Sequence, residues 1–294
     1  MPYLPDNFGL LEEEFSRYET SVVVVLPVPF ERTTSYGKGT AGGPAAILRA
    51  SQAMELYDEE IGGEPFRLGI ATLPPFLPEA FDLAEGLAEL QEAARVQLAA
   101  GKFLITLGGE HSLSQAPVRA ARAVHGEIGV VQFDAHADLR EEFEGTPYSH
   151  ASVMHRLVAD GFPTLAVGIR SLSTPEADLV RARELPVLWG RQLERAEELF
   201  APLLASLPDK VYLTFDIDYF DPALVPATGT PEPGGGLWYP TLALLRTLFR
   251  LKQVVAMDLV ELAPIGGQPA SDFLAAKLVY KCIGYLAALS RPRA

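Results

Sequence analysis

The sequence has one cysteine, no long apolar run and few basic residues, and each of these features excludes a class of protein. Cys282 is the single cysteine among 294 residues, which excludes an internal disulfide bond and any thiolate metal cluster. No stretch reaches the ~18 uninterrupted apolar residues that a membrane-spanning helix needs. Met1–Glu14 contains no basic region followed by an apolar stretch, so no secretory signal is readable there. We therefore expect a cytoplasmic protein that spans no membrane.

The charge balance restricts the partners. With 24 Lys and Arg against 38 Asp and Glu, the formal net charge is −14. Affinity for nucleic acids and for anionic membranes depends on basic patches, so neither is an expected partner. A net negative field concentrates cations, which favours a small cationic substrate, although the same charge also serves solubility alone.

Eight short apolar runs rich in β-branched residues divide the sequence. Runs of this kind are typical of strands covered on both faces, as in parallel sheets. Between most of them lie segments with apolar residues at three- and four-residue spacing, which is typical of amphipathic helices. The alternation predicts one α/β domain, residues 1–294, with a mostly parallel sheet of about eight strands. The predicted strands are Val22–Val28, Arg67–Leu73, Phe103–Leu107, Ile128–Phe133, Leu165–Ile169, Pro186–Trp189, Val211–Phe215 and Val254–Leu259. The predicted helices include Phe81–Ala100, Ser114–Val124, Thr174–Glu184, Arg191–Leu207, Thr241–Leu251 and Ser271–Leu289.

Polar motifs follow four of these strands at the point where each strand ends. They are Gly-Gly-Glu-His at Gly108–His111, Asp-x-His-x-Asp at Asp134–Asp138, Asp-x-Asp at Asp216–Asp218, and Glu261. Ligands of parallel α/β sheets bind at the carboxyl ends of the strands. We therefore expect these side chains to gather at one edge of the sheet.

The spacing within the motifs favours a metal site over a polar strand end. If the chain stays extended, Asp134, His136 and Asp138 face the same side, because side chains two apart do so, and Asp216 and Asp218 behave likewise. Carboxylates and imidazoles this close need a cation between them. Four carboxylates balance two divalent ions, and a ligand set rich in oxygen without thiolate favours Mn²⁺ over Zn²⁺. The candidate ligands are His111, Asp134, His136, Asp138, Asp216 and Asp218.

With these motifs in view, the sequence resembles the ureohydrolase family of arginases and agmatinases, and it is most similar to the agmatinases. The motifs that carry the resemblance lie at Gly108–Ser112, Asp134–Asp138, Phe215–Pro222, Pro226–Pro231 and Met257–Pro264, with weaker matches at Pro27–Thr40 and Gly43–Ile47. The resemblance implies a three-layer α/β/α fold, a homo-oligomer (trimer or hexamer) and two Mn²⁺ per chain. In the family pattern His111, Asp134, Asp138 and Asp216 hold one ion. Asp134, His136, Asp216 and Asp218 hold the other, so that Asp134 and Asp216 bridge.

The resemblance also implies the chemistry. Water activated by the two ions and hydrogen-bonded to Asp138 would attack a guanidinium carbon, which Glu261 holds through paired hydrogen bonds. His150 would pass a proton to the leaving amine, a role that imidazole suits near neutral pH. The products would be urea and an amine such as putrescine or spermidine. His125 and His155 are expected to be structural or solvated, Cys282 to lie in the core, and Asp221 before Pro222 to cap a turn.

The loop that follows the Asp-x-His-x-Asp motif bears on the choice of substrate. Where arginases carry a loop for the amino-acid end of arginine, this chain reads Leu139–Glu144, with Glu141, Glu142 and Glu144. That favours agmatine or the longer polycation N1-aminopropylagmatine over arginine, although these glutamates also fit a solvated loop. Other functions stay open: arginase, a guanidino-acid or formimino hydrolase, a single-zinc deacetylase, or a silent metal- or polyamine-binding protein.

Overall fold

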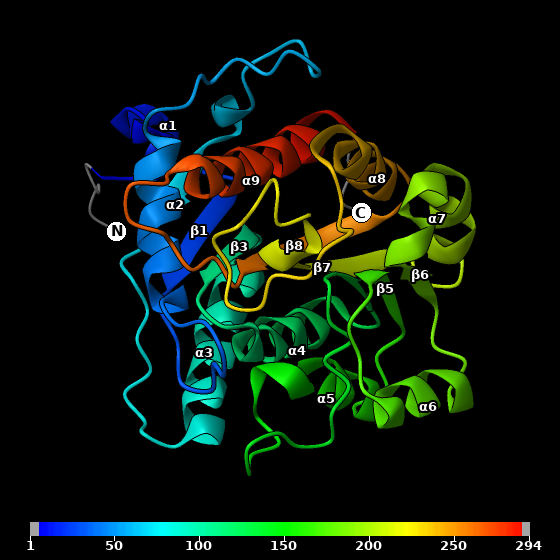
Figure 1. Ribbon diagram of the computed structural model, residues 1–294. Coiled ribbons are helices and arrows are strands. Elements are labelled where there is room, and N and C mark those ends of the chain that lie inside the picture. The colour runs from blue at the N-terminus through cyan, green and yellow to red at the C-terminus, as the bar shows by residue number, and fades with distance from the viewer. Residues whose placement is uncertain (1–5, 290–294) are drawn as a thin grey trace.

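An eight-stranded parallel sheet forms the centre of the molecule, which is a computed structural model describing residues 6–289 (Figure 1). The strand order is β2-β1-β3-β8-β7-β4-β5-β6, and every neighbouring pair is parallel. The strands are β1 (Val23–Val28), β2 (Ile70–Thr72), β3 (Phe103–Gly108), β4 (Gly129–Phe133), β5 (Thr164–Ile169), β6 (Val187–Trp189), β7 (Lys210–Asp216) and β8 (Gln253–Val260). The predicted domain of residues 1–294 extends past the described residues at both ends.

All eight predicted strands are present, and the central ones are buried on both faces of the sheet, whereas the edge strands β2 and β6 are partly exposed. Five consecutive residues of β4 and all six of β1 and β3 are buried. The second run is shorter than predicted. Pro65–Leu68 forms a 3-10 turn, and Gly69 has a φ of +77°, so the strand begins only at Ile70.

Helices cover both faces of the sheet, which gives the three-layer α/β/α architecture (Figure 1). One layer holds α2 (Gly43–Ser51), α7 (Ala196–Leu204), α8 (Trp238–Leu251) and α9 (Ala270–Leu289). The other holds α3 (Leu83–Ala99), α4 (Gln115–His125), α5 (Val153–Ala159) and α6 (Thr174–Ala182). A short helix, α1 (Glu13–Ser16), precedes β1. Within residues 6–289 no helix is both long and apolar enough to cross a membrane.

The predicted helices are found with small shifts at their ends. The segment predicted as Arg191–Leu207 is divided: Gly190–Arg195 is a 3-10 helix, and α7 starts at Ala196. Helix α2 was not among the predicted helices, although Gly43–Ile47 was recognised as a motif. Gly43 is required there by close approach, since a Cβ would lie 2.6 Å from the Leu262 carbonyl oxygen.

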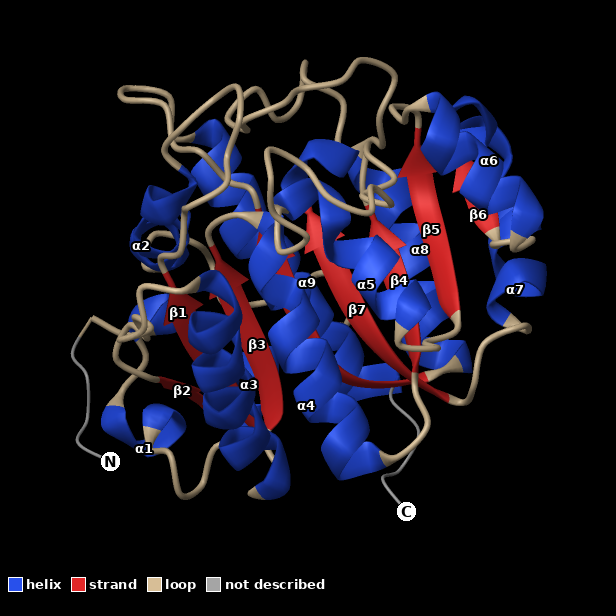
Figure 2. Ribbon diagram, turned by 90° about the horizontal axis from the view of Figure 1, so that it is seen from below, coloured by secondary structure: helices blue, strands red, loops and turns tan. Residues whose placement is uncertain are grey.

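The strand order places the four polar motifs side by side. Strands β3, β8, β7 and β4 are consecutive neighbours at the centre of the sheet, and each one ends in one of the motifs. All strands run in the same direction, toward the side of the molecule where the long loops gather (Figure 2). The edge strands β2 and β6, of three residues each, carry none of these motifs.

Candidate active site

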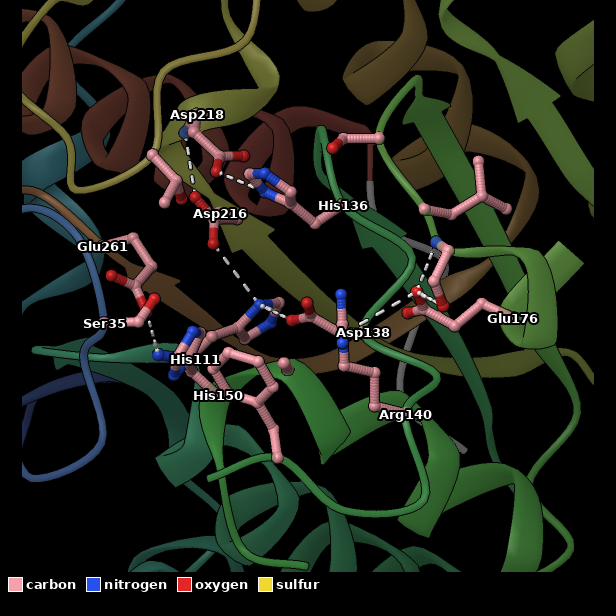
Figure 3. A pocket seen from close by; sticks show the side chains of 16 residues that line it. Ser35, His111, His136, Asp138, Arg140, His150, Glu176, Asp216, Asp218 and Glu261 are labelled. Carbon is pink, nitrogen blue, oxygen red and sulfur yellow. Dashed lines mark hydrogen bonds and ion pairs between the residues drawn. The ribbon is translucent and has the colours of Figure 1, made fainter. Parts of the chain in front are cut away.

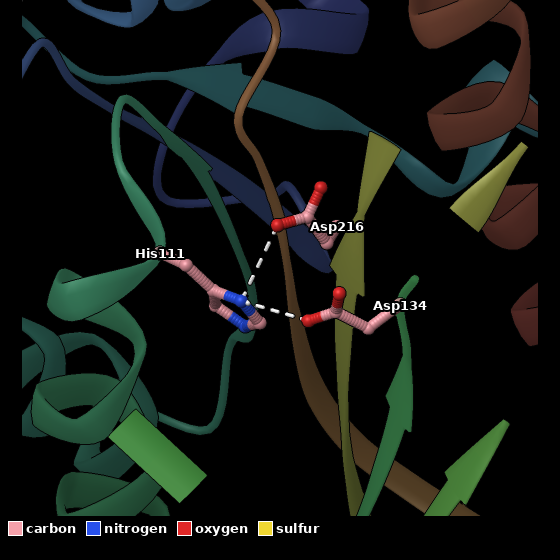
Figure 4. Close-up of side chains that lie close together, drawn as sticks. All are labelled: His111, Asp134 and Asp216. Carbon is pink, nitrogen blue, oxygen red and sulfur yellow. Dashed lines mark ion pairs between the residues drawn. The ribbon is translucent and has the colours of Figure 1, made fainter. Parts of the chain in front are cut away.

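Six acidic and imidazole side chains converge at the carboxyl ends of β3, β4 and β7 (Figures 3 and 4). His111 Nδ1 lies 3.1 Å from Asp134 Oδ2, 3.0 Å from Asp138 Oδ2 and 3.4 Å from Asp216 Oδ2. His136 Nδ1 lies 2.8 Å from Asp218 Oδ2 and 3.7 Å from Asp134 Oδ1. Asp134 therefore contacts both histidines, one through each carboxylate oxygen. Two groups have the spacing of a metal site: His111, Asp134 and Asp216, and Asp134, His136 and Asp218.

The route by which these side chains meet differs from the predicted one. Strand β4 ends at Phe133 and β7 ends at Asp216, so neither motif is an extended strand along its length. Asp138 has a φ of +51°, and its carbonyl accepts the N–H groups of Met154 and His155, each at 3.0 Å. Asp218 lies in a 3-10 turn, Ile217–Tyr219. The alternation argument was therefore wrong in detail: the chain curls around a common centre after each strand.

His111 is set up to offer a lone pair to a cation. Its Nε2 lies 2.9 Å from Thr214 Oγ1, and the Thr214 hydroxyl donates to Asp258 Oδ1 at 2.7 Å. The hydroxyl hydrogen is thus used by Asp258, so Thr214 must accept the hydrogen of Nε2. Nδ1 is then the nitrogen with the lone pair. It is buried, it makes no standard hydrogen bond within the described chain, and it points at three carboxylates. This donor set fits a divalent metal ion.

The charges of the cluster are strongly perturbed when no cation is bound. Burial opposes a charge on His136, but the adjacent Asp218 and Asp134 outweigh it and raise the pKa of His136 to about 11. Burial and the charges of Asp138 and Asp218 raise the pKa of Asp134 to about 7. Burial likewise raises the pKa of Asp216 well above its usual range. In the absence of a cation, these shifts favour the protonated forms of His136, Asp134 and Asp216.

Backbone and side-chain contacts hold the carboxylates in these positions. Gln132 Nε2 donates to Asp134 Oδ2 at 2.8 Å, and the His136 N–H donates to Asp134 Oδ1 at 2.6 Å. Asp218 Oδ1 accepts from the Ala135 N–H at 3.0 Å. Such contacts to metal-binding carboxylates fix their orientation. Sequence reasoning missed Gln132, although it lies on β4 only two residues before the motif.

Glu261 and His150 open onto the same cavity, which has a volume of about 270 Å³ (Figure 3). Glu261 directly follows β8 with a φ of +64°, a conformation rare outside glycine and typical of functional sites. Its Oε1 accepts the His111 N–H at 2.6 Å, and burial raises the pKa of this carboxyl well above its usual range. His150 lies in the 3-10 turn His150–Ser152 between β4 and α5.

Two loops, one at Gly37 and one at residues 226–236, lie at the rim of the cavity. Arg170, which was not among the predicted site residues, holds the second loop in place. The Gly37 N–H donates to the Gly229 carbonyl at 3.1 Å, and a Cβ at Gly37 would lie 2.7 Å from that oxygen. The Arg170 guanidinium donates to the carbonyls of Gly168, Asp218, Tyr219, Phe220, Glu232 and Pro233. Arg170 thereby ties the loop at residues 226–236 to the turn that carries Asp218.

The remaining sequence predictions have mixed outcomes. Cys282 is buried in the core, and Asp221 caps its turn by accepting from the N–H groups of Ala223 and Gly234. His125 lies at the end of α4. His155, predicted to be structural or solvated, lines a second cavity of about 330 Å³ beside the first. That cavity also contains Glu141 and Glu142 but not Glu144.

Comparison with known proteins agrees with this geometry. The family model described as the arginase family matches residues 21–284. The chain belongs to the arginase family. It is 42% identical to the N(1)-aminopropylagmatine ureohydrolase of Synechocystis sp., covering 96% of this chain and 94% of that protein. It is 32% identical to the agmatinase of Pyrococcus horikoshii, covering 89% of this chain and 90% of that protein. The crystal structure of the agmatine ureohydrolase of Thermoplasma volcanium superposes with a TM-score of 0.85 at 29% identity, covering 93% and 92% of the two chains.

Membership of the arginase family confirms the resemblance read from the motifs, the three-layer fold and the enzyme class, a hydrolase of the ureohydrolase type. The clustered histidines and aspartates have a spacing that could hold a metal ion. The role of each residue, the metal and the substrate are taken up next.

Proposed function

We propose that this protein is a binuclear manganese hydrolase that cleaves the guanidinium group of agmatine or a longer relative such as N1-aminopropylagmatine, giving urea and an amine. The observation that carries the proposal is the placement of Glu261 and His150 on a cavity that five residues of the cluster also line: His111, His136, Asp138, Asp216 and Asp218. The residues that would hold the ions are His111, Asp134, His136, Asp138, Asp216 and Asp218. Asp134 belongs to both groups with the spacing of a metal site, whereas Asp216, which the family pattern also gives as bridging, belongs to one of them.

The metal pair supplies charge balance and water activation. When bound, two divalent ions neutralise four buried carboxylates and make water a nucleophile at neutral pH. Asp138, at the edge of the cluster and lining the cavity, can accept a hydrogen bond from that water. Oxygen-rich ligation with two imidazoles and no thiolate supports Mn²⁺ as the ion.

Glu261 and His150 act on the substrate. A guanidinium is planar and donates two parallel hydrogen bonds to a carboxylate, and the buried Glu261 offers such a partner. Burial disfavours the charged form of Glu261 and raises its pKa. A bound guanidinium cation favours the ionised carboxylate and opposes that shift. His150 gives a proton to the amine nitrogen as the carbon–nitrogen bond breaks.

The second cavity supports a substrate with a cationic tail. It shares Arg140, Ser173 and Glu176 with the first cavity, so the two cavities lie side by side. Glu141 and Glu142 line the second cavity, and both are exposed. They offer negative charge to the far ammonium group of a polyamine.

Arg140 supports a second candidate, a hydrolase of guanidino acids. Its guanidinium lies over the Phe143 ring at 4.9 Å, and its Nε is 3.9 Å from the buried carboxylate of Glu176. A cation in the cavity lining suits a substrate carboxylate and opposes an ammonium group. The pair with Glu176 reduces that opposition, which is why the polyamine stands first.

A substrate panel tests the proposal. Urea release is measured with Mn²⁺ against agmatine, N1-aminopropylagmatine, arginine and guanidinobutyrate. We expect the highest kcat/KM for one of the two polyamines. A highest value for guanidinobutyrate would instead assign the second function. No urea from any of the four, in a protein that binds Mn²⁺, would leave a silent binding protein.

The assembly and location belong to the same proposal. We expect a cytoplasmic homo-oligomer, a trimer or hexamer. Support for assembly comes from large exposed side chains near one shallow cavity between α8 and α9, among them Tyr239 and Phe273. Light scattering on the purified protein gives the number of chains, and a monomer at micromolar concentration would contradict this expectation.

A further inference from the structure

Glu110 is a fully buried carboxylate to which the proposed chemistry gives no role. Its Oε2 accepts the backbone N–H groups of Arg32 and Thr33, each at 2.6 Å. Its Oε1 accepts the hydroxyl groups of Thr33, at 2.8 Å, and of Ser112. Glu110 is therefore the acceptor in each of these hydrogen bonds. The Thr33 hydroxyl hydrogen points at Glu110 and is not available to another acceptor.

Thr33 has only lone pairs left for its other neighbour, which is His150. The His150 backbone N–H donates to Thr33 Oγ1 at 3.1 Å, and His150 Nδ1 lies 3.3 Å from the same oxygen. A bare Nδ1 would place a lone pair against a lone pair. The contact with Thr33 therefore favours the tautomer in which Nδ1 carries the hydrogen and donates it to Thr33.

The other ring nitrogen is then the one available to the cavity. Nε2 of His150 makes no hydrogen bond to any residue between 6 and 289, and His150 lines the cavity with Glu261. We propose that Glu110 and Thr33 are positioning residues that hold His150 in the Nδ1–H tautomer, so that Nε2 is the atom that carries the proton to the leaving amine. This inference rests on the proposed function for the part that concerns catalysis.

The proton balance is simple. Nε2 takes one proton released by the attacking water, and the ring becomes an imidazolium with Nδ1–H unchanged. Nε2 then gives that proton to the amine nitrogen as the carbon–nitrogen bond breaks, and the ring returns to its starting tautomer. The second proton of the water leaves the oxygen to solvent as the carbon–oxygen double bond of urea forms. Glu110 and Thr33 exchange no proton at any step.

Ser149 is the competing neighbour. Its hydroxyl oxygen lies 3.4 Å from His150 Nδ1 and accepts the Ala151 N–H at 3.2 Å, so its own hydrogen is free to be donated to Nδ1. That arrangement would stabilise the opposite tautomer. Thr33 is nearer, and it also holds the His150 backbone. Ser149 therefore provides the matched control.

The direct test is the tautomer itself. Full-length protein with ¹⁵N-labelled histidine, kept in Mg²⁺ because Mn²⁺ is paramagnetic, is studied by long-range ¹H–¹⁵N correlation at a pH where the ring is neutral. The His150→Gln spectrum identifies the signals of His150. We expect Nδ1 to be protonated in the wild-type protein. A wild-type ring protonated at Nε2 would overturn the proposal without any further variant.

Variants connect the tautomer to turnover. Thr33→Val keeps the side-chain shape and removes the acceptor, so we expect the Nε2–H tautomer to appear and kcat to fall about tenfold, with KM changed less than about twofold. Thr33→Ser should restore both, and Ser149→Ala should keep the wild-type tautomer. A shift in Ser149→Ala but not in Thr33→Val would assign the ring to Ser149 and refute the proposal.

The two proposals fail separately. Absence of urea from every guanidine, with Nδ1 protonated as expected, would reject the proposed function and keep the tautomer assignment. Urea release from a protein whose His150 carries its hydrogen on Nε2 would reject the assignment alone.

Discussion

The buried cluster and the exposed loops around the cavity differ in burial and in the contacts that hold them. We call the cluster the floor (His111, Asp134, His136, Asp138, Asp216 and Asp218) and the loops at residues 140–144 and 226–236 the rim. On the floor, Asp134 and Asp218 are at most 1% exposed, and N–H groups fix their carboxylates. On the rim, Glu141 and Glu142 are exposed, and the Arg140 side chain is 43% exposed. A charge on the floor has no water to compensate its loss, whereas water screens a charge on the rim. Substitutions on the floor should therefore have much larger effects.

Among these substitutions, Asp134→Asn should cause the largest loss of activity. Asp134 contacts both histidines, so losing one of its charged oxygens affects both metal positions. We expect kcat/KM for urea release to fall on the order of 10³-fold or more, with metal content per chain reduced. Glu144→Gln, at an exposed residue that lines neither cavity, is the control and should change kcat/KM less than about twofold. Similar losses in both variants would remove the distinction between floor and rim.

Asp258→Asn tests the support beneath the floor. Asp258 is fully buried and accepts the hydroxyls of Thr214, at 2.7 Å, and of Tyr212, at 2.9 Å. Because it directs the Thr214 hydroxyl and so the ring of His111, we expect Mn²⁺ affinity to fall about 10–100-fold. Thr214→Val should have the same effect, and Thr214→Ser should not. Calorimetric titration gives the affinities, and unchanged values in folded protein would contradict this role.

Metal binding on the floor should release protons. Without metal the pKa of His136 is raised to about 11, so its ring is protonated at pH 7, and the pKa of His111 is also well above its ordinary value. A metal ion needs the lone pair, so the proton must leave. Each proton released makes affinity rise about tenfold per pH unit through the neutral range. Binding enthalpies measured in buffers of different ionisation enthalpy count the protons, and no buffer dependence would contradict the charges assigned to the floor.

Glu141→Gln combined with Glu142→Gln is the test of the rim. Both side chains line the second cavity, which lies beside the first, and both are screened by water. We expect KM for N1-aminopropylagmatine to rise about threefold to tenfold, and KM for agmatine less. Glu144→Gln, outside that cavity, should leave the ratio of the two KM values unchanged. An equal rise for both substrates would assign these glutamates to solvation only.

The floor was the part most open to prediction from the sequence. Buried parallel strands need continuous apolar runs, and polar residues directly after such runs must lie at the carboxyl edge of the sheet. The curl of the chain after β4 could not be read, because the left-handed backbone of Asp138 depends on contacts with α5. The supports of the histidines were equally hidden. Thr214 is 103 residues from His111, and Thr33 is 117 residues from His150.

The rim was less predictable for a physical reason. Its loops are positioned by backbone hydrogen bonds and by one arginine, Arg170, whose six carbonyl partners leave no pattern in the sequence. Three glutamates were predicted as one group, and the structure places two of them in the second cavity and Glu144 outside it.

The most direct test of the metal centre is anomalous diffraction at the manganese absorption edge from crystals grown with Mn²⁺. We predict two peaks per chain at the carboxyl ends of β4 and β7, one beside His111 Nδ1 and the other beside His136 Nδ1, with Asp134 between them. A single peak, or two peaks away from Asp134, would contradict the binuclear centre on which the proposed chemistry depends.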